Sequence, residues 1–250
     1  MNSSDWDVQG WIEVFKRIEV KESPVGVAFS TNPPNGIARL NDQMRLCQML
    51  KRAQEGNVFY ADPENHICGA GLYILGKDLP PVYTSGEYGA ALQVYDSLRA
   101  ASRLYDHIPR LDKGRNIHYL LFSPLEKLTF SPDLLIVLAQ VEQTEILLRA
   151  LSYSTGKMWT SKCTGVIGCA WAFVYPYLTS ELNYMAILSL GMRAMKLFPP
   201  GRQLISIPFE LLPMMLDNLR RMPLVLPSLQ PGGDEFRRNL LNKFGLDPTH

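Results

Sequence analysis

Apolar residues recur at helical spacing near the N-terminus and then give way to short β-branched runs. Trp11, Phe15 and Ile18 follow the i, i+4, i+7 spacing of an amphipathic helix, which Ser4 or Asp5 can cap. The run PVGVAFS is β-branched and begins at a proline, which predicts a strand. In chain order, the first half is predicted to form a helix over Asp5–Val20, a strand over Pro24–Ser30, a helix over Asp42–Gln54, a strand over Asn57–Ala61, a short helix or helical turn over Cys68–Gly76, a longer helix over Gly86–Asp106 and a strand over Ile117–Phe122.

A strand followed directly by a helix occurs twice in the second half. DLLIVLA and QLISIP are apolar runs with the length of strands. Glu142 and Glu210 open the helices that follow, where the helix macrodipole favours a negative charge. Two such units predict a sheet covered by helices. The predicted strands are Asp133–Ala139, Leu182–Ser189 and Gln203–Pro208, and the predicted helices are Glu142–Tyr153, Thr164–Leu178, Glu210–Arg221 and Asp234–Phe244.

We therefore expect an α+β fold with a mixed sheet covered by helices, in a single domain over residues 1–226. The stretch PSLQPGG predicts a linker, so residues 227–250 form a linker and a C-terminal helix. Phe236, Leu240, Leu241 and Phe244 fall on one apolar stripe of that helix. The stripe can pack on its own domain, on a second copy in a homo-oligomer or on another partner.

Composition limits the class of protein. The 250 residues are enough to bury a core without a disulfide or metal. The 25 basic and 24 acidic residues nearly balance, which argues against a nucleic-acid binder that uses a broad basic face. The longest uncharged apolar stretch, Gly165–Ser180, contains Pro176 and is shorter than the roughly 18–20 residues of a membrane span. We expect a cytoplasmic protein without membrane or nucleic-acid partners.

Familiar nucleotide and hydrolase motifs are absent from the sequence. It contains no P-loop, no G-x-G-x-x-G, no G-x-S-x-G and no H-E-x-x-H. The cluster CGAG follows a predicted strand and precedes an apolar run, so the backbone near Gly69 and Gly71 could face an anion. Packing or turn formation explains the same glycines.

Four cysteines, Cys47, Cys68, Cys163 and Cys169, give the sharper signal. In a cytoplasmic chain they are expected to be thiols or metal ligands rather than disulfides. They form no C-x-x-C, which excludes a zinc ribbon or thioredoxin motif. His66 lies two residues before Cys68 and could add a ligand. Thiolates that converge from different elements can hold a cluster or metal, whereas cysteines in a core act as small hydrophobes.

One basic cluster lies in an apolar context, GMRAMKLFPPGRQ. Its Arg193 and Arg202 could hold a carboxylate or phosphate by charge-assisted hydrogen bonds. A solvated loop explains the same charges. The many methionines and tyrosines suit a core or the wall of an apolar pocket.

Several stretches together resemble a known prokaryotic family, domain of unknown function 169, which is common in archaea and anaerobic bacteria. They are PVGVAF, EGNVFYADPENHICGAG, FSPLEKLTFSPDLLIVLA, ILLRALSYSTG, GCAWAFVYPYLT and ISIPFELLPMMLDNL. The resemblance implies that cysteines recur at positions matching Cys47, Cys68 and Cys169, with Cys163 outside the pattern. Three thiolates would suit an Fe–S cluster with one open iron, or a metal with an exogenous ligand. His66 or Cys163 is then the candidate fourth ligand.

Three hypotheses follow. The first is a cysteine-ligated 4Fe–4S cluster or zinc site. Its role would be electron transfer, metal or cluster handling, or anaerobic redox metabolism with a redox or metabolic protein partner. The second is a metal-free binding protein or enzyme whose Met and Tyr pocket takes an anion on Arg193 or Arg202, with Cys68 at a helix start as a nucleophile. The third is a partner-binding module that docks through the C-terminal helix.

Overall fold

A six-stranded sheet forms the centre of the computed structural model, which describes residues 7–115, 117–187 and 189–246. The strands lie in the order β2-β3-β1-β4-β6-β5. Their bounds are β1 Val25–Ser30, β2 Phe59–Ala61, β3 Tyr119–Pro124, β4 Leu134–Ala139, β5 Asn183–Ala186 and β6 Gln203–Pro208. The α+β class is confirmed.

The sheet is antiparallel where a mixed sheet was expected. All pairings between the six strands are antiparallel, and the parallel contacts are two isolated bridges, Arg39 with Tyr60 and Met44 with His66. The reason lies in the connection after β4. The chain does not return from the following helix to a parallel neighbour but forms β5 first, and β6 then runs back between β5 and β4.

Strand β4 explains why the sheet has two covered faces. Its sequence LLIVLA is buried throughout, and successive side chains of a strand point to opposite faces. Leu134, Ile136 and Leu138 accordingly belong to one core, and the alternate residues Leu135 and Val137 belong to the other. A continuous apolar run is therefore required here, rather than alternation of apolar and polar residues.

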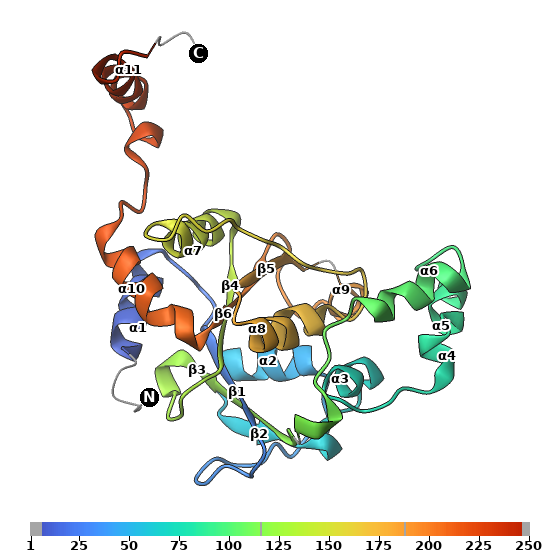
Figure 1. The fold of residues 1–250 in the computed structure, drawn as a ribbon. Coiled ribbons are helices and arrows are strands. Elements are labelled where there is room, and N and C mark those ends of the chain that lie inside the picture. The colour runs from blue at the N-terminus through green and yellow to red at the C-terminus, as the bar shows by residue number, and fades with distance from the viewer. Residues whose placement is uncertain (1–6, 116, 188, 247–250) are drawn as a thin grey trace.

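Helices cover both faces (Figure 1). One core includes residues of α1, α7 and α10, and the other includes residues of α2, α3 and a helical run over 168–179. The helix bounds are α1 Val8–Arg17, α2 Leu46–Gln54, α3 Gly69–Ile74, α4 Pro81–Thr84, α5 Glu87–Ala91, α6 Leu98–Ser102, α7 Val141–Ser152, α8 Tyr175–Thr179, α9 Leu190–Ala194, α10 Leu212–Arg221 and α11 Gly233–Lys243. The 3₁₀ turns are η2 Pro63–Asn65, η3 Arg103–Asp106, η4 Lys113–Arg115, η5 Leu125–Lys127, η7 Phe209–Leu211 and η8 Pro227–Leu229, and η6 Ala170–Val174 is a π-helix within the helical run.

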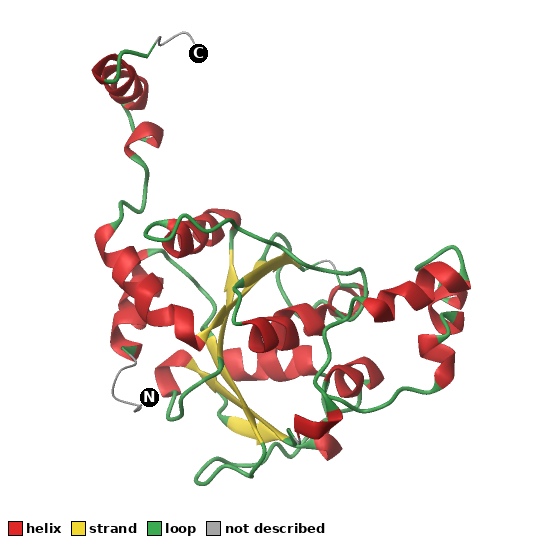
Figure 2. Ribbon diagram, in the orientation of Figure 1, coloured by secondary structure: helices red, strands yellow, loops and turns green. Residues whose placement is uncertain are grey.

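The long helix predicted over Gly86–Asp106 is wrong. The chain there forms α5, α6 and η3, because Gln93 adopts a left-handed φ of 57° and ends α5. Ser97 then starts α6 by accepting a hydrogen bond from the backbone N–H of Ala100. Together with α4, these short helices form an arm over residues 81–106 that extends beside the sheet (Figure 2). We call this segment the helical arm.

Two other predicted helix starts differ. Helix α1 is capped by Asp7, whose carboxylate accepts from Gly10 N–H at 2.7 Å, while Ser4 and Asp5 lie outside the described residues. Helix α2 begins at Leu46 rather than at Asp42, because the preceding chain is extended and Met44 bridges to His66. The remaining predicted strands and helices correspond to observed elements, with ends shifted by a few residues.

Helix α11 lies apart from the sheet, beyond η8 (Figure 1). Phe236, Leu240 and Phe244 of its apolar stripe are 45%, 42% and 65% exposed, so the stripe does not pack on its own domain. Across the described ranges, no helix combines the length and apolar character of a membrane span.

Candidate functional site

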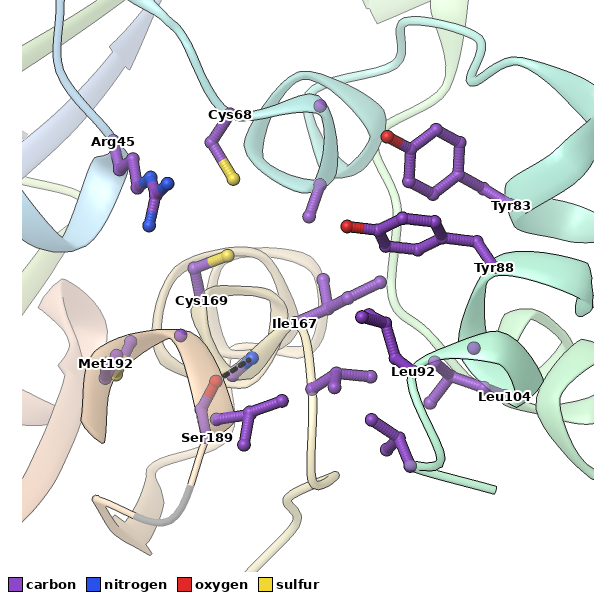
Figure 3. Close-up of a pocket in the computed structure, with 18 of the residues that line it drawn as sticks. Arg45, Cys68, Tyr83, Tyr88, Leu92, Leu104, Ile167, Cys169, Ser189 and Met192 are labelled. Atoms are coloured by element: carbon purple, nitrogen blue, oxygen red, sulfur yellow. Dashed lines mark hydrogen bonds between the residues drawn. The ribbon is translucent and has the colours of Figure 1, made fainter. Parts of the chain in front are cut away.

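A cavity of about 380 Å³ lies between the helical arm and the starts of helices that cover one face of the sheet. Its wall on the sheet side comes from the starts of α2, α3, α9 and the helical run. Its wall on the arm side is largely aromatic and aliphatic and includes Tyr83, Tyr88, Leu92 and Leu104 (Figure 3). Apolar cavities with few polar groups are the usual form of small-molecule sites in proteins.

Three cysteines line this cavity, each from a different helix start. Cys47 is the second residue of α2, Cys68 is the N-cap of α3, and Cys169 lies in the first turn of the helical run. The thiols of Cys68 and Cys169 point into the same space (Figure 3). All three are free thiols. The fold therefore brings together cysteines that are far apart in the sequence.

Burial and mutual proximity govern the acidity of these thiols. Burial raises the pKa of Cys47 to about 11, and the charge of Cys68 adds to the increase. Burial also raises the pKa of Cys169 far above its usual range, with further increases from Cys68 and Cys47. Backbone N–H groups at the helix starts act in the opposite direction on both sulfurs but are outweighed. Cys47 and Cys169 therefore hold their protons at neutral pH.

The helix start that carries Cys169 is under local strain. Ile167, two residues earlier, has a left-handed φ of 57°, which is rare for a β-branched residue. Gly168 packs so closely that an added Cβ would lie 2.6 Å from Ser189 Cβ, and its N–H donates to Ser189 Oγ at 3.3 Å. A π-helix follows directly. Strained backbone and π-helical turns both concentrate at functional sites.

Three polar side chains also face the cavity. In Figure 3 the Arg45 guanidinium points toward the thiols, and the hydroxyls of Tyr83 and Tyr88 point inward from the arm. Arg45 Nη1 contacts Met195 Sδ at 3.1 Å. The two tyrosine rings pack together with their centroids 4.7 Å apart. Tyrosines were expected in the wall of an apolar pocket, although neither Tyr83 nor Tyr88 was singled out. Arg45, two residues before Cys47, was not a candidate.

Comparison with known proteins assigns the family. The sequence profile of domain of unknown function 169 (DUF169), described as an uncharacterised ArCR family, matches residues 15–218. The chain belongs to the DUF169 family. An uncharacterised protein of Methanocaldococcus jannaschii is 25% identical over 181 residues, which cover 71% of this chain and 76% of that protein. No solved structure matches this DUF169 protein.

The other ligands expected in the DUF169 chain lie elsewhere. Cys163 is exposed and outside the cavity lining, and its thiol contacts the Thr164 carbonyl oxygen at 3.4 Å. His66 is buried outside the cavity lining, and its Nδ1 has no hydrogen-bond partner among the described residues. Burial lowers the pKa of His66 to about 4. Neither residue joins the three cysteines.

Of the four residues expected to bind an anion in the DUF169 chain, one lies at the cavity and three lie outside it. Gly69 lines the cavity. Gly71 lies outside the lining and packs instead, with an added Cβ 3.6 Å from Leu46. Arg193 is exposed, and Arg202 pairs with Glu22 at 3.3 Å. The cationic group at the cavity is thus Arg45 rather than either predicted arginine.

A single metal ion has no ready-made site in the described part of the DUF169 chain. There, no three His, Cys, Asp or Glu side chains gather closely enough to act as ligands of one ion. The three cysteines share a cavity but do not form such a cluster.

Proposed function

We propose that this DUF169 protein holds an Fe–S cluster on Cys47, Cys68 and Cys169 and leaves one metal position open to the cavity. One observation carries the proposal: three cysteines that are distant in the sequence begin three helices and line one cavity of about 380 Å³. Helix starts present free N–H groups and the positive end of the macrodipole, both of which stabilise bound anionic sulfur.

The residues fit such a group in their chemistry. Thiolates are the usual protein ligands of Fe–S clusters, and hydrogen bonds to the sulfurs adjust the reduction potential. The backbone N–H groups that lower the pKa of Cys47 and Cys169 are placed to provide these bonds. In an Fe–S cluster each cysteine ligates a different iron atom, so the three sulfurs need not be close enough to bind one ion. A tetrahedral zinc site, in contrast, needs its sulfurs about 3.8 Å apart.

The cavity favours a role that involves a small molecule. A protein that only transfers electrons needs no space beside its cluster, whereas a redox or Lewis-acid step on a bound molecule does. A cluster would supply one-electron transfer and an open coordination position. The chain would supply the thiolates, exclude water with the aliphatic wall of the helical arm, and orient the ligand through Arg45 and the two tyrosines.

Anaerobic purification tests the proposal. We expect a brown protein with a broad visible absorption band and with iron and acid-labile sulfide in similar amounts, as isolated or after anaerobic reconstitution. Zinc found in place of iron would keep the cysteine site but contradict the cluster. A colourless sample that stays metal-free after reconstitution would contradict the whole proposal.

A further inference from the structure

Arg45 is available to bind a ligand. Its backbone is fixed at the N-cap of α2, where its N–H donates to Gln48 Oε1 at 3.0 Å. Its side chain is exposed, and the one side-chain hydrogen bond that it makes to a described residue is to Met195 Sδ, a weak thioether acceptor. No salt bridge to Arg45 is found within the described ranges, whereas Arg39, Arg149 and Arg202 pair with carboxylates. The guanidinium thus faces the cavity with no anionic partner from the described part of the chain (Figure 3).

The charge of the cavity selects the kind of anion. Among the described residues that line it, Arg45 is the only Asp, Glu, Lys, Arg or His side chain. A monoanion balances one guanidinium, and a carboxylate matches its planar pair of N–H donors. A phosphate dianion would leave one of its charges without a cationic partner among the described lining residues.

The shape of the cavity indicates what the carboxylate is attached to. Arg45 and the thiols lie at the sheet side, and Ile167, Leu92 and Leu104 form an aliphatic wall beyond them (Figure 3). A chain or ring of a few carbon atoms can lie against this wall. The Tyr88 hydroxyl points into the same space from the arm and can bond a second polar group.

We infer that the cavity binds a small monocarboxylic acid, with its carboxylate on Arg45, its apolar body against the helical arm, and its intervening atoms beside Cys68 and Cys169. This inference deepens the proposed function, because it names the class of ligand that the same cavity takes. It rests on this cavity being the working site. The recognition itself uses Arg45 and the aliphatic wall, so it can be tested whether or not a cluster is present.

Calorimetric titration of the full-length protein tests the inference, with iron and sulfide determined on the same sample. The probes are hexanoate and 3-phenylpropanoate, each beside its neutral amide, and inorganic phosphate. We expect both acids to bind at least tenfold more tightly than their amides and more tightly than phosphate. Arg45→Ala should weaken acid binding by about tenfold or more, the usual effect of losing a charge-assisted hydrogen-bonded pair.

Arg193, which is exposed like Arg45 but lies outside the cavity lining, provides the matched control, and Arg193→Ala should leave acid binding unchanged. Binding of the amides as tightly as the acids would overturn the inference, and so would equal effects of the two arginine variants or no binding of either acid. Circular dichroism of Arg45→Ala establishes that the variant is folded. Iron content reports on the cluster separately, so acid binding by an iron-free protein would support this inference while contradicting the proposed cluster.

Discussion

Cys68 and Cys169 begin two helices that are far apart in the sequence, yet they lie close enough for the charge of Cys68 to raise the pKa of Cys169. Both thiols point into one cavity (Figure 3). The shared cavity brings together two parts of the chain, since Cys68 follows β2 and Cys169 precedes β5. The pair is the structural basis for expecting the cysteines to act together rather than as separate core residues.

Cys47 should make the stability of the metal-free protein depend on alkaline pH. The folded pKa of about 11 lies above the ordinary value of 9.0, so folding favours the protonated thiol. Its contribution is complete below pH 9 and is lost as pH rises through 11. We expect the unfolding free energy of wild type, relative to Cys47→Ala, to fall by up to about 3 kcal/mol over this range. Urea titrations at several pH values measure it, and a difference that does not change with pH would contradict the assignment.

The same raised pKa predicts how metal loading depends on pH. Cysteine binds a metal as the thiolate, so loading must release the protons held by Cys47 and Cys169. We expect anaerobic reconstitution to be more complete at pH 8.5 than at pH 6.5, with protons released to a weakly buffered solution. Iron uptake that is independent of pH would show that these thiols are not the ligands.

His66 should weaken the fold in acid. Its folded pKa of about 4 lies below the ordinary 6.5, because the imidazole is buried. The contribution of the neutral ring to the free energy of unfolding is complete above pH 6.5 and is lost as pH falls toward 4. The loss should reach about 3 kcal/mol and should be smaller in His66→Gln.

The exposed His118 gives the control for that experiment. His118→Gln should leave the acid dependence of the unfolding free energy as in wild type. If the two variants show the same dependence, burial of His66 is not the cause.

Gly168 should be required for the correct position of Cys169. An alanine Cβ would lie 2.6 Å from Ser189 Cβ, so Gly168→Ala must displace α9 or the helical run. We expect a loss of about 1–3 kcal/mol in unfolding free energy, measured by urea denaturation, and a lower iron content. Gly165→Ala is the matched control, since an added Cβ there meets no atom within 4 Å. Equal effects of the two variants would contradict the packing argument.

The sequence predicted most of the elements because their patterns are local. LLIVLA is an apolar run with the length of a strand that is buried on both faces, and Pro132 lies just before it. The prediction of a long helix over Gly86–Asp106 was wrong because Gln93 adopts a left-handed φ. Glutamine gives no sign of this conformation in the sequence. The prediction of a mixed sheet was wrong because strand pairing depends on where the chain returns to the sheet. The local pattern of apolar and polar residues does not encode that return.

The candidate site was predicted in part for the same reason. Cys47, Cys68 and Cys169 were identified by residue type and by the resemblance to the family, but their meeting in one cavity depends on the tertiary fold. Arg193 and Arg202 stood out because they cluster in the sequence. Arg45 was missed because a single arginine before a helix is ordinary, and only its direction distinguishes it.

The central claim is that Cys47, Cys68 and Cys169 together hold an Fe–S cluster, and iron and sulfide analysis of four single variants tests it most directly. Each cysteine is changed to serine, and the proteins are purified and reconstituted anaerobically in parallel. The account predicts that Cys47→Ser, Cys68→Ser and Cys169→Ser lose most of their iron and sulfide, while Cys163→Ser, in the exposed position outside the cavity, keeps the wild-type content. Full iron and sulfide in any of the first three variants, or an equal loss in Cys163→Ser, would contradict it.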